Sequence, residues 1–213
     1  MYLKGNLQSD HAKQSALTYL NDNTRFPDFH ITVPVGAEYA DIQDSAFEQA
    51  CILYWGDGFG VTTSAIQNIT KLEGWYFSSR SSTLNNANFD ITTINTINLS
   101  GFTNLTEIGA STFSGCTNLR NIILPSGLKR LSYDDGSSSF AGCFRSCSNL
   151  SSIQLPNGLE DLGDRCFMSC SSLTSIQFPQ TLKYIGGGPS GSNQDGGVFH
   201  GCGLTSVTFP NSI

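Results

Sequence analysis

Leu150-Ser-Ser-Ile153-Gln-Leu155-Pro-Asn-Gly-Leu159-Glu-Asp-Leu162-Gly-Asp-Arg-Cys166-Phe167-Met-Ser-Cys170 decides the fold, because the chain repeats this pattern. Self-similarity at a period of about 20 to 50 residues is typical of proteins built from stacked repeats. One copy follows this stretch and others precede it. Their matching positions are Leu173, Ile176, Phe178, Pro179, Leu182, Ile185, Phe199 and Cys202; Leu119, Ile122, Leu124, Pro125, Leu128, Leu131, Phe144 and Cys147; and Ile94, Ile97, Leu99, Leu105, Ile108, Phe113 and Cys116.

Each copy predicts one coil of a solenoid. The segment L-x-x-I-x-L alternates apolar and polar residues, which favours a strand, and copies stacked side by side would pair these strands into a parallel sheet. Pro then ends the strand, Leu-x-x-Ile/Leu-Gly is interpreted as a turn, and the Phe that follows fills the coil. No copy buries both of its flanks alone, so each needs its neighbours.

Charged positions indicate the stacking register. The residue after the repeated Leu is Lys129, Glu160 and Lys183 in successive copies. The next residue is Arg130, then Asp161, then Tyr184. Because neighbouring strands lie about 4.8 Å apart, opposite charges would face each other from coil to coil.

The consensus L-x-x-I-x-L-P-x-x-L-x-x-I/L-G, followed by F-x-x-C, resembles the leucine-rich repeats of BspA-like bacterial surface proteins (named after Bacteroides surface protein A). The resemblance covers residues 94–213 and is interrupted by insertions at Ser132–Ser139 and Gly187–Gly197. It implies an α/β repeat solenoid, a leucine-rich repeat array with a parallel β-sheet face and short irregular or 3₁₀ turns. We expect about four copies and a partial last one in residues 93–213.

Residues 1–92 are expected to form an N-terminal strand and a small α-helical cap. The block Phe47–Leu72 resembles the helical cap that precedes the repeats of internalin-like proteins. Its two helices would begin with Ser45, in a capping box with Glu48, and with Ser64. Further upstream we predict a helix over 9–20 and a strand over 29–35.

The seven cysteines allow three interpretations. Cys143, Cys147, Cys166 and Cys170 have a spacing that could hold zinc or allow a disulfide. The favoured interpretation is structural, because the cysteines of the F-x-x-C column recur as small buried side chains. The Gly/Asp loop at 56–60 has too few carboxylates for a calcium site. We therefore expect no metal and no cofactor.

Composition excludes some partners. The net charge of −6 and 11 Lys and Arg residues argue against nucleic acid, and no apolar run is long enough to insert into a membrane. The sequence shows no secretory signal, and its end at Pro210–Ile213, in mid-repeat, favours a piece of a longer protein. We expect a monomer.

The outward strand positions are polar and carry no general acid or base, so we expect no enzymatic activity. The resemblance implies an extracellular or cell-surface adhesion module that binds a protein or a glycan on a host or bacterial surface. The alternative is a structural spacer of a longer surface protein or phage appendage. The candidate binding residues lie on the strand face and in the first insertion: Arg120, Asn121, Ile123, Ser152, Gln154, Ser175, Gln177, Tyr133, Asp134 and Asp135.

Overall fold

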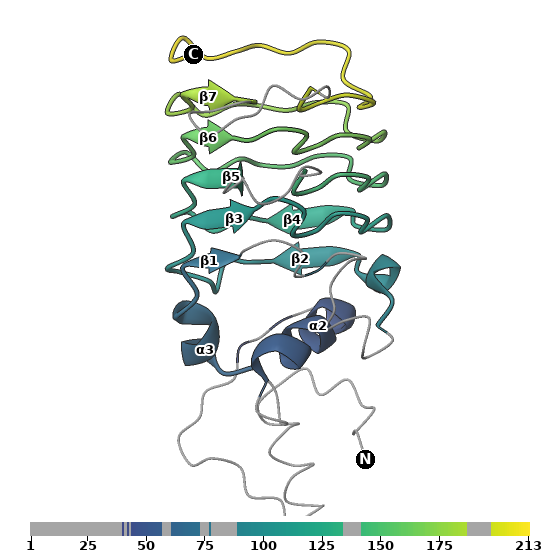
Figure 1. Ribbon diagram of the computed structural model, residues 1–213, viewed down its shortest axis with the longest axis vertical. Coiled ribbons are helices and arrows are strands. Elements are labelled where there is room, and N and C mark those ends of the chain that lie inside the picture. The colour runs from purple at the N-terminus through teal and green to yellow at the C-terminus, as the bar shows by residue number, and fades with distance from the viewer. Residues whose placement is uncertain are drawn as a thin grey trace, which may run out of the picture.

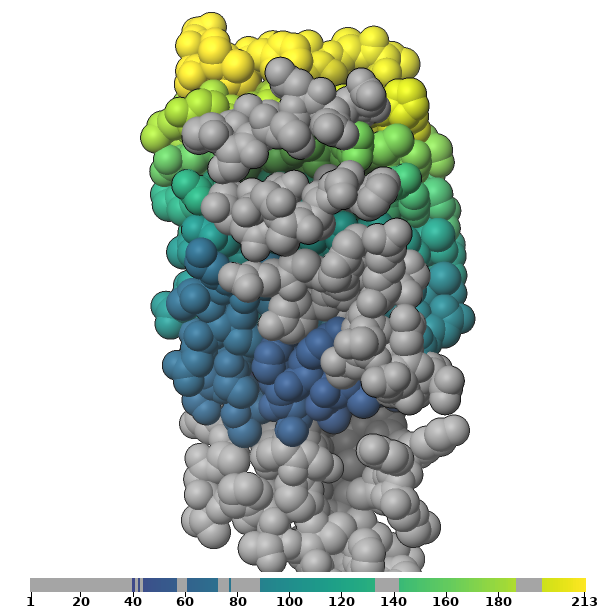
Figure 2. Space-filling view, viewed as in Figure 1, coloured from purple at the N-terminus to yellow at the C-terminus, as the bar shows by residue number. Residues whose placement is uncertain are grey.

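The computed structural model describes residues 40, 42, 44–56, 61–72, 77, 89–133, 142–186 and 197–213. Over these residues the chain winds into coils that stack along the long axis, with two helices at one end and residue 213 at the other (Figure 1). In the space-filling view the coils follow one another as bands from blue to yellow (Figure 2). The predicted solenoid is confirmed.

The regular elements are short. The helices are α2 (Ser45–Trp55), α3 (Thr63–Gln67) and the 3₁₀ turn η1 (Ile91–Thr93). The strands are β1 (Lys71–Leu72), β2 (Thr96–Asn98), β3 (Glu107–Gly109), β4 (Asn121–Ile123), β5 (Arg130–Tyr133), β6 (Asp161–Leu162) and β7 (Tyr184–Ile185).

The strands form two parallel sheets. The larger has the order β1-β3-β5-β6-β7, and its strands lie one above another in Figure 1. The smaller contains β2 and β4, and an isolated bridge between Gln154 and Gln177 continues its pattern in later coils. The main sheet therefore comes from the Leu-x-x-Ile/Leu-Gly segment. Our interpretation of that segment as a turn was wrong.

The L-x-x-I-x-L segment gives the smaller sheet, and a proline follows it in every copy but the first. A proline has no N–H to donate to a ladder, and Pro125, Pro156 and Pro179 follow this segment in successive copies. The first copy has Ser100 at that position. There β2 pairs with β4 over three residues, and the N–H of Leu99 donates to Ile123 O at 2.9 Å.

In the main sheet every coil donates to the coil before it. The N–H of Lys129 binds Thr106 O at 2.8 Å, that of Glu160 binds Lys129 O at 2.9 Å, and that of Lys183 binds Glu160 O at 2.8 Å. Just after β6 the backbones of two neighbouring coils approach closely. A Cβ added to Gly163 would lie 2.0 Å from Ser132 O. Gly163 is thus required by the approach of two backbones.

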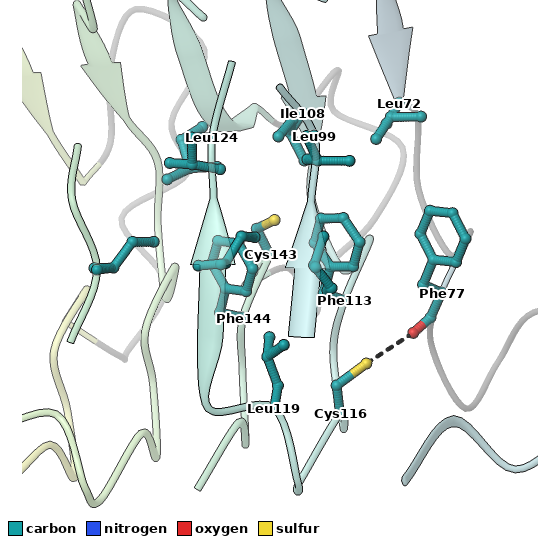
Figure 3. Close-up of a cluster of buried hydrophobic side chains, with 14 of the residues drawn as sticks. Leu72, Phe77, Leu99, Ile108, Phe113, Cys116, Leu119, Leu124, Cys143 and Phe144 are labelled. Atoms are coloured by element: carbon teal, nitrogen blue, oxygen red, sulfur yellow. Dashed lines mark hydrogen bonds between the residues drawn. The ribbon is translucent and has the colours of Figure 1, made fainter. Parts of the chain in front are cut away.

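Columns of similar apolar side chains form the core inside the coils. The rings of one phenylalanine column are nearly parallel, with interplanar angles of 5–7° and centroids 5.3 to 5.8 Å apart. Figure 3 shows three of them beside the inward Leu and Ile side chains. The column consists of Phe77, Phe113, Phe144, Phe167 and Phe199.

This column begins earlier than the sequence interpretation placed it. Ile69, Leu72 and Phe77 have the spacing of Leu105, Ile108 and Phe113. β1 pairs with β3 in that register, and Phe77 stacks on Phe113. The equal spacing was the signal that would have identified this half-coil. The division at residue 93 stays a prediction, although the main sheet begins before it.

The predicted helices are present, but their capping residues differ from the prediction. Asp44, not Ser45, caps α2, and its Oδ1 accepts from the N–H of Phe47 at 2.8 Å. Thr62, not Ser64, caps α3 and accepts from the N–H of Ala65 at 3.2 Å. The elements predicted over 9–20 and 29–35 lie outside the described residues.

Candidate interaction faces

The outward positions of L-x-x-I-x-L form one surface, which we call the polar face. The inward residues beneath it, Ile97, Ile122 and Ile153, are buried. All its positions are exposed except Thr96 and Asn98, which are partly buried. The polar face consists of Asn95, Thr96, Asn98, Arg120, Asn121, Ile123, Ser151, Ser152, Gln154, Thr174, Ser175, Gln177, Thr205, Ser206 and Thr208.

Strand register sets the columns of this face. Thr96 lies beside Asn121, Asn98 lies beside Ile123, and Gln154 bridges to Gln177. Amides and hydroxyls therefore follow one another from coil to coil over a rigid aliphatic layer. Such an array can donate and accept hydrogen bonds, and it carries no carboxylate or imidazole at its described positions.

The structure brings seven of the ten candidate residues onto this surface and separates one. Tyr133 ends β5 in the other sheet, where its backbone pairs with Gly109. Asp134 and Asp135 lie outside the described residues, as does the side chain of Tyr133. A binding role for all ten stays a prediction. The seven residues on the polar face are Arg120, Asn121, Ile123, Ser152, Gln154, Ser175 and Gln177.

The first insertion was predicted to begin at Ser132, but it begins later. Ser132 belongs to β5 and is buried, so the insertion starts after it. Its Oγ accepts from the N–H of Cys143 at 3.1 Å and donates to Asp164 O in the next coil at 3.2 Å. The serine thereby joins the two sides of the insertion and holds both against the neighbouring coil.

The outer side of the main sheet carries ion pairs, which we call the charged ladder. Glu107 lies between Lys71 at 2.8 Å and Arg130 at 3.8 Å. Glu160 lies between Lys183 at 2.8 Å and Lys129 at 3.6 Å. The predicted facing of opposite charges is confirmed.

Two adjacent carboxyls of the ladder have opposite pKa shifts. Hydrogen bonding and charge attraction from Lys183 lower the pKa of Glu160. Burial raises the pKa of the half-buried Asp161, although the charge of Arg130 acts in the other direction. Oδ1 of Asp161 has no hydrogen-bond partner among the described residues.

Four of the cysteines donate hydrogen bonds from coil to coil inside the core, and we call this series the thiol ladder. All seven are free thiols, and the described residues contain no group of three or more His, Cys, Asp or Glu side chains able to hold a metal ion. Figure 3 shows the first rung, from Cys116 Sγ to Phe77 O. The sulfur–oxygen distances are 3.1 Å for Cys116–Phe77, 3.3 Å for Cys147–Phe113, 3.1 Å for Cys170–Phe144 and 3.0 Å for Cys202–Phe167.

Burial makes these thiols poor nucleophiles and poor ligands. It raises the pKa of Cys116 to about 12, and raises that of Cys170 to about 12 with the help of Cys202. The thiolate is the reactive and metal-binding form, and at neutral pH it is scarce here. The geometry favours the structural interpretation of the column.

Comparison with solved structures finds three bacterial leucine-rich repeat proteins. One is from T. pallidum, at 26% identity and a TM-score of 0.43, covering 62% of this chain and 48% of that chain. Another, from Bacteroides ovatus, has 25% identity and a TM-score of 0.41 over 57% and 30% of the two chains. The third, from Eubacterium ventriosum, has 20% identity and a TM-score of 0.39 over 69% and 37%. This chain thus spans less than half the length of each.

No curated protein matches the chain. None of the helices in the described part reaches the length and apolar character that crossing a membrane requires. A family model described as "BspA type Leucine rich repeat region (6 copies)" matches residues 60–140. That match starts before the first predicted copy, in agreement with the half-coil at Leu72 and Phe77. Residues 60–140 are thus similar to leucine-rich repeats of the BspA type.

Proposed function

We propose that this chain is a non-enzymatic binding module of an extracellular or cell-surface protein, and that its polar face receives a protein or glycan partner. Leucine-rich repeats are a general protein-binding repeat type. Solenoids present extended surfaces that suit this use. The observation that carries the proposal is the polar face itself, where seven candidate residues share one exposed surface.

The rigidity of this surface supports the proposal. In the first three coils its strand positions alternate with Ile97, Ile122 and Ile153, which are at most 8% exposed. A surface held from beneath loses little conformational freedom when a partner binds, and pre-organisation of this kind favours affinity. The charged ladder on the other sheet is less suited, because its lysines and glutamates already satisfy one another.

Arrays of matrix proteins and glycans, probed with the purified chain, test the proposal. A detected partner should lose binding when Gln154 and Gln177 are both replaced by Glu, because two adjacent carboxylates would interrupt the neutral array. The control is Lys183→Gln in the charged ladder, which should bind as the parent does. Binding that survives the double Glu variant would place the interaction elsewhere.

A structural spacer is the second candidate, and the internal ladders favour it. Stacked rings, thiol hydrogen bonds and backbone hydrogen bonds join every coil to the next, which suits a rigid connecting segment. Silence on all arrays at high protein concentration would support the spacer and contradict the binding module.

A further inference from the structure

Arg120 is the single charged side chain of the polar face, whose other members are Asn, Thr, Ser, Gln and Ile. Its backbone N–H donates to Asn95 O at 2.8 Å, which fixes the residue in the coil register. The side chain is exposed, and its guanidinium makes no hydrogen bond or ion pair with the described residues. Five donors in a planar fork are therefore available to a partner.

Unlike Arg120, the basic side chains of the main sheet are paired with carboxylates. Lys71, Lys129, Arg130 and Lys183 all lie within 4.0 Å of a carboxylate oxygen. Asp90, at the corner that leads into β2, is also engaged, since its Oδ1 accepts from both the N–H and the hydroxyl of Thr92. Arg120 thus keeps a local positive charge on a chain whose net charge is −6.

Ile123 lies on the same strand segment and is 52% exposed. It is the one aliphatic side chain of the polar face, and by register it follows Asn98 of the preceding coil. An arginine and an exposed aliphatic group surrounded by amides and hydroxyls have the composition of a protein interface centre with a polar rim. Arginine is also enriched among residues that dominate binding energy.

We propose that Arg120 and Ile123 form the centre of a protein-binding site, and that the partner segment presents a carboxylate to Arg120 beside an apolar side chain that covers Ile123. This inference rests on the proposed binding function and adds the chemistry of the partner. A guanidinium binds a carboxylate through two parallel hydrogen bonds. Because the whole chain is acidic, a run of carboxylates would be repelled, so the segment carries one or two acidic residues.

A random peptide library panned against the intact chain tests the proposal. Enriched peptides should contain Asp or Glu together with Leu, Ile, Val or Phe. For a synthetic enriched peptide, Arg120→Gln should weaken binding by about tenfold or more, since a charge-assisted hydrogen-bond pair is lost. Replacing the acidic residue of the peptide, Asp by Asn or Glu by Gln, should weaken binding to the same extent. In the chain, Ile123→Ser should weaken binding by several-fold.

The control is Lys183→Gln, which removes one positive charge from the charged ladder and should change affinity less than twofold. Arg120→Glu should reverse the selection and enrich Lys or Arg peptides. Circular dichroism verifies that each variant keeps the fold.

Peptides that bind Arg120→Gln as well as the parent would overturn this inference. The proposed function would survive if the same peptides still lost binding to the double Glu variant at Gln154 and Gln177. Absence of any enriched peptide would also overturn it.

Sialyllactose, a trisaccharide with one carboxylate, is tested in parallel. Arg120-dependent binding of sialyllactose without peptide binding would identify an acidic glycan and reject the protein segment.

Discussion

The carboxylate of Asp44 accepts a hydrogen bond at 3.1 Å from the backbone N–H of Thr96, in the edge strand β2. Its other oxygen caps α2 through the N–H of Phe47. One side chain thus satisfies a helix terminus and a strand edge that are 52 residues apart in sequence. This contact ties the helical end of the molecule to the first coil of the smaller sheet.

We predict that Asp44→Ala lowers the free energy of unfolding by about 1–2 kcal/mol, because loss of a helix cap alone costs about this much. The variant also loses the hydrogen bond from the N–H of Thr96, which adds to the destabilisation. Urea unfolding followed by circular dichroism measures the change. Ser45→Ala is the matched control, since Ser45 is exposed and is not the cap. Equal losses in the two variants would contradict the assignment of Asp44.

Sequence alone predicted the coil, its buried columns and its register, because these depend on residue type at fixed spacing. Phe113, Phe144 and Phe167 stack as their common column predicts. The assignment of the sheets was harder, since both segments of a coil are short and both contain inward Leu or Ile. Pro125 and Pro156 were interpreted as the ends of strands, and the strands of the main sheet begin after them, at Arg130 and Asp161.

The contacts of the helical end could not be predicted. Asp44 and Ser45 are adjacent, and both are favoured at a cap. The hydrogen bond from Thr96 to Asp44 depends on the tertiary arrangement. At the candidate site, the sequence pattern predicted that Arg120 and Gln154 face outward, and both side chains are exposed. Their role in binding stays a prediction. The position of Tyr133 in a different sheet required the topology.

Gly163 provides a test of coil spacing. An added Cβ would lie 2.0 Å from Ser132 O and 3.4 Å from Leu131 O, so two backbones must separate. We predict that Gly163→Ala destabilises the protein by about 3 kcal/mol or more, within the range for severe steric changes. Gly127→Ala is the control, because its nearest neighbour, Thr103 O, is at 3.7 Å. Thermal unfolding should separate the two variants, and similar midpoints would contradict the required close approach.

The thiol ladder predicts slow thiol chemistry in the folded protein. With the pKa of Cys116 and Cys170 raised from 9.0 to about 12, native thiols should react with a disulfide reagent at pH 8 only through unfolding. Cys202 is the exception, because it is partly exposed. Labelling followed by mass spectrometry should find Cys202 modified first and all seven cysteines modified in guanidinium. Rapid native labelling of Cys116 would contradict the buried ladder.

The same shifts give a pH dependence. A thiol whose pKa is higher in the folded state contributes stability that is complete below the unfolded pKa near 9 and declines as the pH rises toward 12. We therefore predict that the free energy of unfolding falls between pH 9 and 12, and that it falls less steeply in Cys170→Ala. Urea unfolding across this range is the measurement. Parallel curves for the two proteins would indicate that the thiols do not titrate differently on folding.

Glu160 and Asp161, neighbours on the charged ladder, should respond oppositely to loss of charge. The lowered pKa of Glu160 means that its ionised form is favoured by folding, so its contribution is present above the unfolded pKa and is lost as the pH falls through the folded pKa. The raised pKa of Asp161 means that its ionised form opposes folding at neutral pH, chiefly through burial.

We predict that Glu160→Gln lowers the urea midpoint slightly at pH 7, as expected for an exposed ion pair, and that Asp161→Asn raises it. Each difference should shrink as the pH falls through the folded pKa of the parent carboxyl, at a lower pH for Glu160 than for Asp161. High salt should reduce the effect at Glu160 more, because exposed charges are screened more strongly than half-buried ones. A lower midpoint for Asp161→Asn at pH 7 would show that attraction to Arg130 outweighs burial, and would reverse the sign assigned to this carboxyl.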